Sequence, residues 1–543
     1  MGDGLVVAKP KLIKLKIRKN FLTGKILLDD IKGNVTIKKL MFVHRNSLEN
    51  EKQSFPVFVK KKGAKYHIIF NIDITNSSWK PFYWDAYIGV EINNLLHFFR
   101  VKISNDKLKF KMNALPFLNS ICLNQDYHIF PYITSYGSFS LTYKKRMYYE
   151  SKKYMLKWLL AFLIYLFLKP YWDYKKIWLG FEKHANVAQD NGFTFFRYCY
   201  EKQKHNNFYY VIRNNSPDIP NFKGMEDKLV FFMSLKYMIY FFASKLLISS
   251  ESKGHLYDIR IQNGFFRRVL NRKKNIFLQH GVIGLKRVDN IFHKNSNNRA
   301  DLFITSSDFE KKIIVTNFGY QNDEVEVTGL SRWDNLQNNI YTQKILVMPT
   351  WRSWMDDITD EEFVKTDYYL RYSKLIQSSE LKELIQQFDL TITFYLHHKF
   401  KKHLSLFKSV IEQIKVNCYG DSPLQKEIME SSLMITDYSS VAWDMFYLKK
   451  PVVFYQFDKE EYLKNQGSYL DFPKDLFGDQ ALDLMSLIIL IKGYASNGFR
   501  EKKKYSINRE KYFKYIDHKN SERIFNTIKK HFPYYLSQFK SKN

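Results

Sequence analysis

The sequence predicts an α/β protein in which a β-rich domain precedes two consecutive Rossmann-like domains. Short stretches that alternate apolar and polar residues fill the first 145 residues. From Lys176 onward, short continuous apolar runs alternate with helical stretches instead. The chain has 543 residues, 45% of them hydrophobic, which is enough for two or three separate cores.

Residues 1–145 are predicted to form a β-rich accessory domain. Alternating stretches at 34–43, 66–73 and 83–90 are separated by Asn, Ser, Lys and Gly. Such alternation is typical of strands that bury one face and expose the other. We expect a small β-sandwich that acts as a binding or placement module.

Residues 146–175 form a basic and apolar connector. Residues 158–168 are all apolar or aromatic, but a bilayer-spanning helix needs about 20 such residues, so the run is too short to cross. Lysines flank it at positions 152, 153, 157, 169, 175 and 176. Two interpretations remain open, an interfacial helix on an anionic membrane surface and an ordinary buried helix.

Residues 176–340 and 341–543 each carry one set of short apolar runs. The runs lie at 176–180, 208–212, 245–250, 275–279, 302–305 and 325–328, and then at 344–348, 390–395, 432–436 and 451–455. Continuous hydrophobicity indicates strands that are buried on both faces, as in parallel sheets covered by helices. Such sheets bind ligands beyond the carboxyl ends of their strands, so functional residues are expected directly after these runs.

Charge and cysteine content narrow the class of protein. Lys and Arg number 85 against 54 Asp and Glu, a formal charge of +31. This excess fits a polyanionic partner or simply a solvated basic surface. Nucleic acid is disfavoured because no nucleic-acid-binding motif accompanies the charge. The three cysteines lack the spacing of a zinc site or disulfide framework, which fits a reducing compartment, and the lysine-rich start lacks the apolar core of a signal peptide.

The segment 433–455 contains the strongest candidate site. An apolar strand ends at Thr436, Asp437 to Ser440 make a turn, and a helix follows. Free N–H groups at the helix start and the hydroxyls of Ser439 and Ser440 suit phosphate. Asp and Ser are also preferred helix caps, so capping and phosphate binding both remain open for this turn.

Three further candidates follow other strands. His280 and Gly281 come directly after the run at 275–279, where an imidazole can accept a proton from a hydroxyl group. His397 lies in a His-His-Lys segment after 390–395, and the histidine pair lacks the acidic or thiol partners of a metal site. Arg352 follows 344–348, and its forked donors suit phosphate oxygens.

This ordered series of motifs resembles the CDP-glycerol glycerophosphotransferase family, the teichoic acid primases and polymerases. The resemblance extends from Lys176 to Ile524. The matching segments are 176–180, 190–192, 279–281, 328–334, 349–352, 435–441 with Asp444, and 513–523. Gln279 and Ser331 stand where the family motifs have tryptophan and proline.

The resemblance implies a GT-B-like pair of Rossmann-type domains with the active site between them. It also implies a CDP-alditol donor, a lipid-linked or polymeric acceptor, and release of CMP. His280 would be the general base, and His397 would stabilise the donor pyrophosphate. The donor- and phosphate-binding set would comprise Gly281, Arg332, Arg352, Asp437, Ser439 and Ser440.

On this interpretation the chain is a peripheral enzyme at the cytoplasmic face of the cell membrane. No cofactor is certain and no metal ligands are predicted, while a dependence on a divalent cation stays open. Two other functions remain open: a GT-B nucleotide-sugar glycosyltransferase of surface polysaccharide synthesis, and a non-catalytic protein that binds membrane or polymer. The released nucleotide would separate the first alternative from the phosphotransferase.

Overall fold

The computed structural model describes residues 8–536 except 30, 32, 46–50, 105, 115–119, 124–125, 135–136, 260, 262–263, 339–342, 356–357 and 419–420. The chain divides into two compact units. Residues 1–166 and 257–272 form the first, called here the accessory unit. Residues 167–256 and 273–543 form the second, called here the Rossmann unit.

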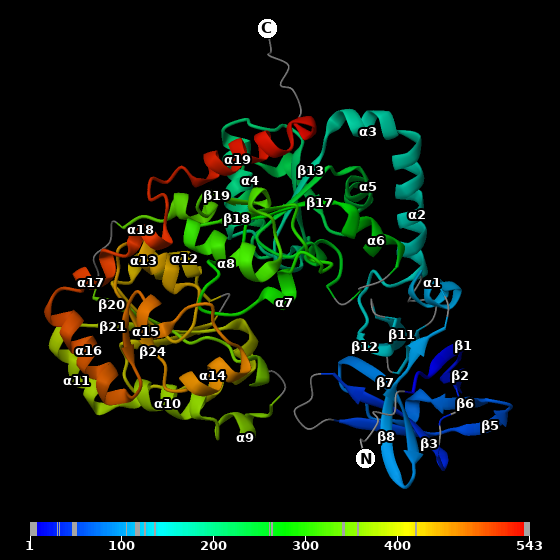
Figure 1. The fold of residues 1–543 in the computed structure, drawn as a ribbon. Helices are drawn as coiled ribbons and strands as arrows, with labels where there is room; N and C mark the ends of the chain where they lie inside the picture. Colours follow the sequence, from blue (N-terminus) through cyan, green and yellow to red (C-terminus); the bar gives the residue numbers. More distant parts are fainter. Residues whose placement is uncertain are drawn as a thin grey trace. The chain divides into compact units, whose positions relative to one another are not determined.

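The accessory unit is a β-sandwich. Sheet 1 has the strand order β5-β6-β2-β1-β9, and sheet 2 has the order β10-β11-β12-β7-β3-β4 with β8 paired to β7 (Figure 1). The bounds are β1 (Lys11–Arg18), β2 (Phe21–Asp29), β3 (Val35–His44), β4 (Lys52–Pro56), β5 (Phe58–Lys62), β6 (Lys65–Asp73), β7 (Phe82–Ile92), β8 (Leu95–Arg100), β9 (Lys102–Ile103), β10 (Ile121–Cys122), β11 (Tyr127–Ile133) and β12 (Phe139–Lys145). Inward side chains of both sheets, such as Ile26, Phe42 and Ile68, share one core, as the alternation predicts.

Three helices accompany the sandwich: α1 (Asp106–Ala114), α2 (Lys152–Phe167) and α6 (Phe265–Arg272). Helix α2 buries Trp158, whose ring stacks on that of Phe266 at 4.3 Å. The next segment, α3 (Lys169–Lys175), begins the Rossmann unit. No single helix of the described residues has the length and apolar composition to span a bilayer, although α2 and α3 taken together meet that test.

The Rossmann unit contains two parallel sheets. Sheet 3 has the order β15-β14-β13-β16-β17-β18-β19, and sheet 4 the order β22-β21-β20-β23-β24-β25. The bounds are β13 (Trp178–Phe181), β14 (Phe208–Ile212), β15 (Leu229–Phe231), β16 (Leu246–Ser249), β17 (Lys274–Phe277), β18 (Leu302–Thr305), β19 (Val325–Val327), β20 (Lys344–Met348), β21 (Thr391–Leu396), β22 (Ile414–Cys418), β23 (Leu433–Thr436), β24 (Val452–Tyr455) and β25 (Asp479–Ala481). When the strands of each sheet are numbered in chain order, the spatial order of both sheets begins 3-2-1-4, which is the Rossmann arrangement. The predicted pair of Rossmann-type domains is confirmed.

All ten predicted runs of the Rossmann unit are strands, and three further strands escaped the prediction. These three, β15, β22 and β25, are edge strands of their sheets. Edge strands are partly exposed, and β22 and β25 include exposed positions between buried ones. Strands β22 and β25 therefore lack the continuous hydrophobicity that marks a central strand, whereas β15 is apolar but only three residues long.

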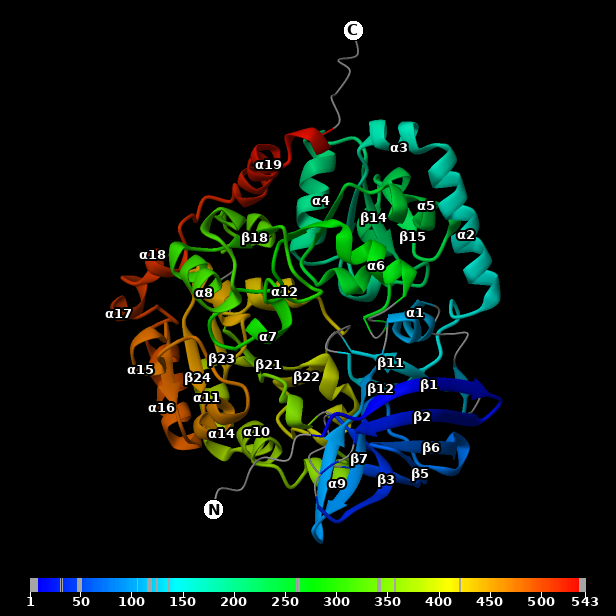
Figure 2. The same ribbon diagram turned by 45° about the vertical axis from the view of Figure 1, so that its right-hand side comes forward.

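Helices cover the sheets. Their bounds are α4 (Asn191–Glu201), α5 (Leu235–Ala243), α7 (Asp289–Phe292), α8 (Asp308–Phe318), α9 (Asp360–Phe363), α10 (Asp367–Gln377), α11 (Ser379–Phe388), α12 (Leu424–Glu430), α13 (Ala442–Tyr447), α14 (Lys459–Asn465), α15 (Phe472–Asp475), α16 (Leu484–Ser496), α17 (Lys503–Ser506), α18 (Arg509–Tyr512) and α19 (Asn520–His531). Figures 1 and 2 show α19 beside α4. Ile524, Phe525 and Ile528 of α19 join the core of sheet 3.

The structure thus divides the chain differently from the predicted boundaries at two places. Residues 257–272, predicted inside the first Rossmann domain, belong to the accessory unit. Helix α19, predicted inside the second Rossmann domain, packs on the first. In both cases a helix packs against a domain that is distant in sequence. Local sequence patterns do not reveal such long-range packing.

Candidate active site

Three polar residues follow the central strands of sheet 3. Glu182 comes after β13, Glu251 after β16, and His280 after β17. The order of sheet 3 reverses between β13 and β16, the place where such sheets bind ligands. Gln279, before His280, has a left-handed backbone conformation with a φ of 65°. Its side chain donates to the carbonyl of Ile304, and its own carbonyl accepts from the side chain of Asn191.

His280 is held between two carboxylates. Its Nδ1 lies 2.9 Å from Asp190 Oδ2 and 3.6 Å from Glu251 Oε1. The side chain is nevertheless 66% exposed, so the ring has an open side. With Nδ1 donating to Asp190, Nε2 is the nitrogen that remains to accept a proton.

The two carboxylates also set the proton affinity of His280. Desolvation lowers its pKa, but Glu251 and Asp190 outweigh this effect and raise the pKa to about 9. Asp190 has a lowered pKa because Arg332 and His280 outweigh its own desolvation. Burial raises the pKa of Glu251, while His280 and Lys183 oppose that shift. At neutral pH the imidazole is therefore mostly protonated.

A pH profile follows from this arrangement. If His280 acts as a base, kcat/KM rises about tenfold per pH unit and levels off near the pKa of about 9. Glu251→Gln removes one carboxylate that raises this pKa, so the plateau should begin at lower pH. The exposed Glu461→Gln is the matched control and should leave the profile in place. A Glu251→Gln profile identical to that of the wild type would contradict the coupling.

Asp190 is itself positioned by a buried carboxylate. Glu182 is 1% exposed and accepts backbone N–H groups from Gln189, Asp190 and Phe193. Asp190 then caps α4 by accepting from the N–H of Asn191. Capping leaves the second oxygen of Asp190 for His280.

Arg332 joins this cluster to the second Rossmann domain. Its Nη1 donates to Asp190 at 2.9 Å and to the carbonyl of His280 at 2.6 Å. Its Nε and Nη2 donate to the carboxylate of Asp444 in α13 at 3.0 and 2.8 Å. Arg332 is only 7% exposed, so its donors serve the protein and not the solvent. The structure assigns it to holding the two domains and Asp190 together.

Gly281 brings the two domains close beside His280. A Cβ atom on Gly281 would lie 2.6 Å from Ser440 Oγ, so only glycine fits without displacing Ser440. Ser439 accepts from the N–H of Val441 and is 8% exposed, while Ser440 is half-buried. The turn of Asp437–Ser440 therefore faces the segment that carries His280.

Asp437 and Arg352 lie beneath that turn. Asp437 is fully buried and accepts from Thr350 N, Tyr438 N, Arg352 and the hydroxyl of Tyr372. Arg352 is also fully buried, with Asp437 and Asp458 each at 2.8 Å and Thr350 O at 2.7 Å. Its guanidinium has no exposed surface to offer a ligand, so it orders the turn from below.

His397 belongs to a basic and aromatic group on the same sheet edge. Its ring stacks on Trp351, with centroids 5.8 Å apart, and its side chain accepts from Lys399 N. Lys399 and Lys286 place their ammonium groups over the Trp351 ring at 5.2 and 5.1 Å. Lys286 comes from the loop after His280, so this group also draws on both domains.

A further cation lies at the end of β13. Burial lowers the pKa of Lys183, Glu251 opposes the shift, and the charge of Lys399 adds to it. Lys183 thus lies within electrostatic reach of both the carboxylate beside His280 and the basic group around Trp351. Together these residues form an anion-attracting edge next to the exposed imidazole.

The sequence predicted His280, the Asp437 turn and His397 as site residues, but assigned no role to Glu182, Glu251, Lys183 or Lys286. The first three directly follow β13 and β16, so the strand-end rule was a sufficient signal for them. Lys286 follows no strand directly and gave no such signal. Its place is decided by the tertiary structure.

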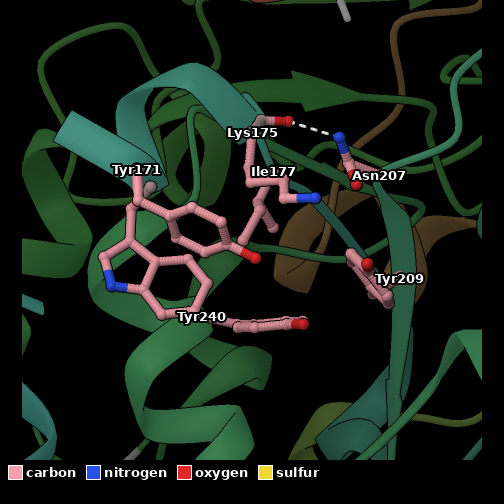
Figure 3. A pocket seen from close by; sticks show the side chains of 7 residues that line it. Tyr171, Lys175, Ile177, Asn207, Tyr209 and Tyr240 are labelled. Atoms are coloured by element: carbon pink, nitrogen blue, oxygen red, sulfur yellow. Dashed lines mark hydrogen bonds between the residues drawn. The ribbon is translucent and has the colours of Figure 1, made fainter. Parts of the chain in front are cut away.

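No three His, Cys, Asp or Glu side chains of the described residues are grouped to hold a metal ion. A separate small pocket lies elsewhere in the Rossmann unit, lined by Tyr171, Trp172, Lys175, Ile177, Asn207, Tyr209 and Tyr240. Figure 3 shows its rings around Lys175, with Asn207 donating to the Lys175 carbonyl. It contains none of the predicted site residues.

Two curated proteins of teichoic acid synthesis are similar in sequence to this chain. Minor teichoic acid biosynthesis protein GgaB of Bacillus subtilis (strain 168) is 30% identical over 369 residues, which cover 65% of this chain and 40% of that protein. A teichoic acid poly(glycerol phosphate) polymerase of Staphylococcus epidermidis is 27% identical over 318 residues, 52% of this chain and 40% of that protein. The chain thus spans 40% of the length of these two curated relatives.

The solved structure of the wall teichoic acid polymerase TagF is 17% identical, with a TM-score of 0.47, and covers 70% of this chain and 98% of that chain. A family model described as CDP-Glycerol:Poly(glycerophosphate) glycerophosphotransferase matches residues 161–530, more than half of the chain. The chain therefore belongs to the CDP-glycerol:poly(glycerophosphate) glycerophosphotransferase family.

Proposed function

We propose that this chain transfers glycerol phosphate, or a related alditol phosphate, from a CDP-alditol donor to a lipid-linked or polymeric acceptor. The reaction would serve teichoic acid or capsule-like polymer synthesis and release CMP. One observation carries the proposal. A chain of contacts from His280 through Asp190 and Arg332 to Asp444 links a candidate base to the helix that follows the Asp437 turn.

In this mechanism His280 Nε2 accepts the proton of the acceptor hydroxyl. The hydroxyl oxygen bonds to the distal phosphorus of the donor, and the bond from that phosphorus to the bridging oxygen breaks. CMP leaves with the bridging oxygen and its electron pair. Phosphoryl transfer mainly requires positioning and charge stabilisation, so a strong general acid is not required.

The basic groups have a corresponding part in this proposal. His397, Lys399 and Lys286 would stabilise the donor pyrophosphate, and Ser440 and Ser439 would contact phosphate oxygens. Among the described residues, no acceptor takes the backbone N–H groups of Ser439 and Ser440. Gly281 would keep this turn close to the base. Arg332, Arg352 and Asp437 would position these groups without touching the donor.

The test is a donor assay with the purified full chain. CDP-glycerol and CDP-ribitol are each incubated with a lipid-linked acceptor, and CMP and product length are measured. Both donors are needed because relatives include glycerol-phosphate and ribitol-phosphate polymerases. UDP-sugars serve as control donors. Turnover of a UDP-sugar without CMP release from either CDP-alditol would establish the glycosyltransferase alternative instead.

We further propose that α2 attaches the protein peripherally to the anionic cytoplasmic face of the membrane. Its exposed apolar residues repeat at helical spacing: Leu156, Leu159, Leu160, Leu163, Leu166 and Phe167. This stripe lies on a helix whose other side buries Trp158. Lysines flank this stripe, and α3 adds aromatic residues. Such a combination of apolar, basic and aromatic residues is typical of a segment that lies at a membrane interface.

Leu159→Glu with Leu163→Glu should weaken binding to phosphatidylglycerol vesicles about tenfold or more, because two apolar contacts are replaced by charges that anionic lipid repels. The measurement is vesicle co-sedimentation of the full chain. Leu370→Glu, at a 51% exposed leucine of α10, is the matched control. Equal vesicle binding by the α2 variant and the wild type would rule out this attachment.

A further inference from the structure

The outer face of sheet 1 in the accessory unit is strongly basic. The basic side chains of β1, β2, β5 and β6 on this face are Lys11, Lys14, Lys16, Arg18, Lys25, Lys60, Lys62 and Lys65, and their acidic side chains are Asp29 and Asp73. Their positions follow from strand register, because Leu15, Ile26, Ile68 and Phe70 on the same strands point into the core. Figure 2 shows β1, β2, β6 and β5 side by side in this sheet.

The strand register places two pairs of these cations directly opposite one another. Lys14 lies opposite Lys25, and Lys62 lies opposite Lys65, while Lys60 lies opposite His67. Lys25 in turn lies opposite Ile69, and Phe58 lies beyond it on β5. The face therefore carries cations on all four strands, with Leu27, Ile69 and Phe58 lying between some of them.

Little of this charge is neutralised. Among the described residues, only Lys65 of this face pairs with an acidic side chain, Asp29 at 3.8 Å. Asp73 instead caps a short helix through Thr75 N. The pKa of His67 is lowered by desolvation and then by the positive charges of Lys25, Lys62 and Lys65. Directly opposed like charges destabilise a sheet, so such an arrangement favours an anionic ligand.

Resting on the proposed function, we propose that this face, called here the lysine platform, binds the anionic alditol-phosphate polymer on which the enzyme acts. A linear polymer with one phosphate per unit matches rows of cations along strands. Side chains two residues apart on a strand lie about 6.6 Å apart, a distance that one alditol phosphate can bridge. Thr23, Asn71 and His67, between the cations, suit the hydroxyl groups of the alditol.

The pattern favours a polymer over a membrane. Exposed apolar residues on the lysine platform are Phe21, Phe58 and Ile69, and Phe58 and Ile69 alone are adjacent. They do not form the continuous apolar stripe that α2 has. A polymer bound here would raise the effective concentration of acceptor for the same chain.

The test compares two triple variants of the full chain. The platform variant carries Lys14→Gln, Lys25→Gln and Lys60→Gln. The control variant carries Lys382→Gln, Lys415→Gln and Lys492→Gln, at exposed lysines of the Rossmann unit. A fluorescent 1,3-linked glycerol phosphate oligomer is the probe, and its Kd is measured by anisotropy at several salt concentrations without donor.

We expect the platform variant to bind the oligomer at least about tenfold more weakly, and the slope of log K against log salt to fall by about 2, since each contact of a single strand contributes about 0.7. The control variant should bind like the wild type. Equal weakening of both variants, or no weakening of the platform variant, would overturn the proposal. So would loss of binding to phosphatidylglycerol vesicles with oligomer binding retained.

Two measurements keep the result unambiguous. Circular dichroism verifies folding, and a second variant with Lys11→Gln, Lys16→Gln and Lys62→Gln replaces the first if it unfolds. CMP release with a short soluble acceptor should stay unchanged in both platform variants. Absence of CMP release in the wild type would contradict the proposed function, whereas intact release with unchanged oligomer binding in the variants would contradict only the lysine platform.

Discussion

His280→Ala should lower kcat about 10²–10⁴-fold with little change in KM for the CDP-alditol. In the proposed mechanism the imidazole accepts the proton of the acceptor only as the new bond to phosphorus forms, so its loss would affect the transition state more than donor binding. The imidazole lies 2.9 Å from Asp190 and its side chain is 66% exposed, so in the variant Asp190 keeps its contact with Arg332 and gains contact with water. Initial rates of CMP release from the full chain are the measurement.

The residual activity of this variant should also lose the rise with pH, because the titrating base is gone. His97→Ala, at a partly exposed histidine of the accessory unit, is the control and should retain the rate. A loss below tenfold in His280→Ala, with the pH profile preserved, would assign the base to another residue. His397 would then be the next candidate.

Arg352→Met should destabilise the second Rossmann domain by about 3–5 kcal/mol, because it leaves the buried carboxylates of Asp437 and Asp458 without their shared cation. Arg352 is fully buried and donates to both carboxylates and to Thr350 O. Urea denaturation followed by far-UV circular dichroism gives the free energy of unfolding. Arg299→Ala, at an exposed arginine, should change it by less than about 0.5 kcal/mol.

A second substitution separates this positioning role from direct phosphate binding. Arg352→Met combined with Asp458→Asn removes one of the unpaired charges and should recover part of the lost stability. A phosphate ligand would behave differently: its loss would raise KM for the donor more than tenfold while the free energy of unfolding stayed within about 1 kcal/mol. That outcome would return Arg352 to the donor-binding set.

The central strands and the position of His280 were predictable because their signals are local. A strand buried on both faces is apolar over most of its length, and most of the ten predicted runs of the Rossmann unit meet this condition, although β19 carries Glu326. His280 and Asp437 directly follow such strands, at the sheet edge where ligands bind. Edge strands such as β22 escaped prediction because one side of each is exposed.

By itself, then, the sequence determined the two parallel sheets, the β-sandwich before them, and the strand ends that carry the site. Only the tertiary structure decided which groups meet there. Arg332 reaches Asp444 across 112 positions of chain, and Asp190 reaches His280 across 90. It also decided that Arg352 is buried and that α19 packs on sheet 3. Hydrophobic periodicity is a property of neighbouring residues, whereas ion pairs between distant strand ends depend on how whole sheets are placed.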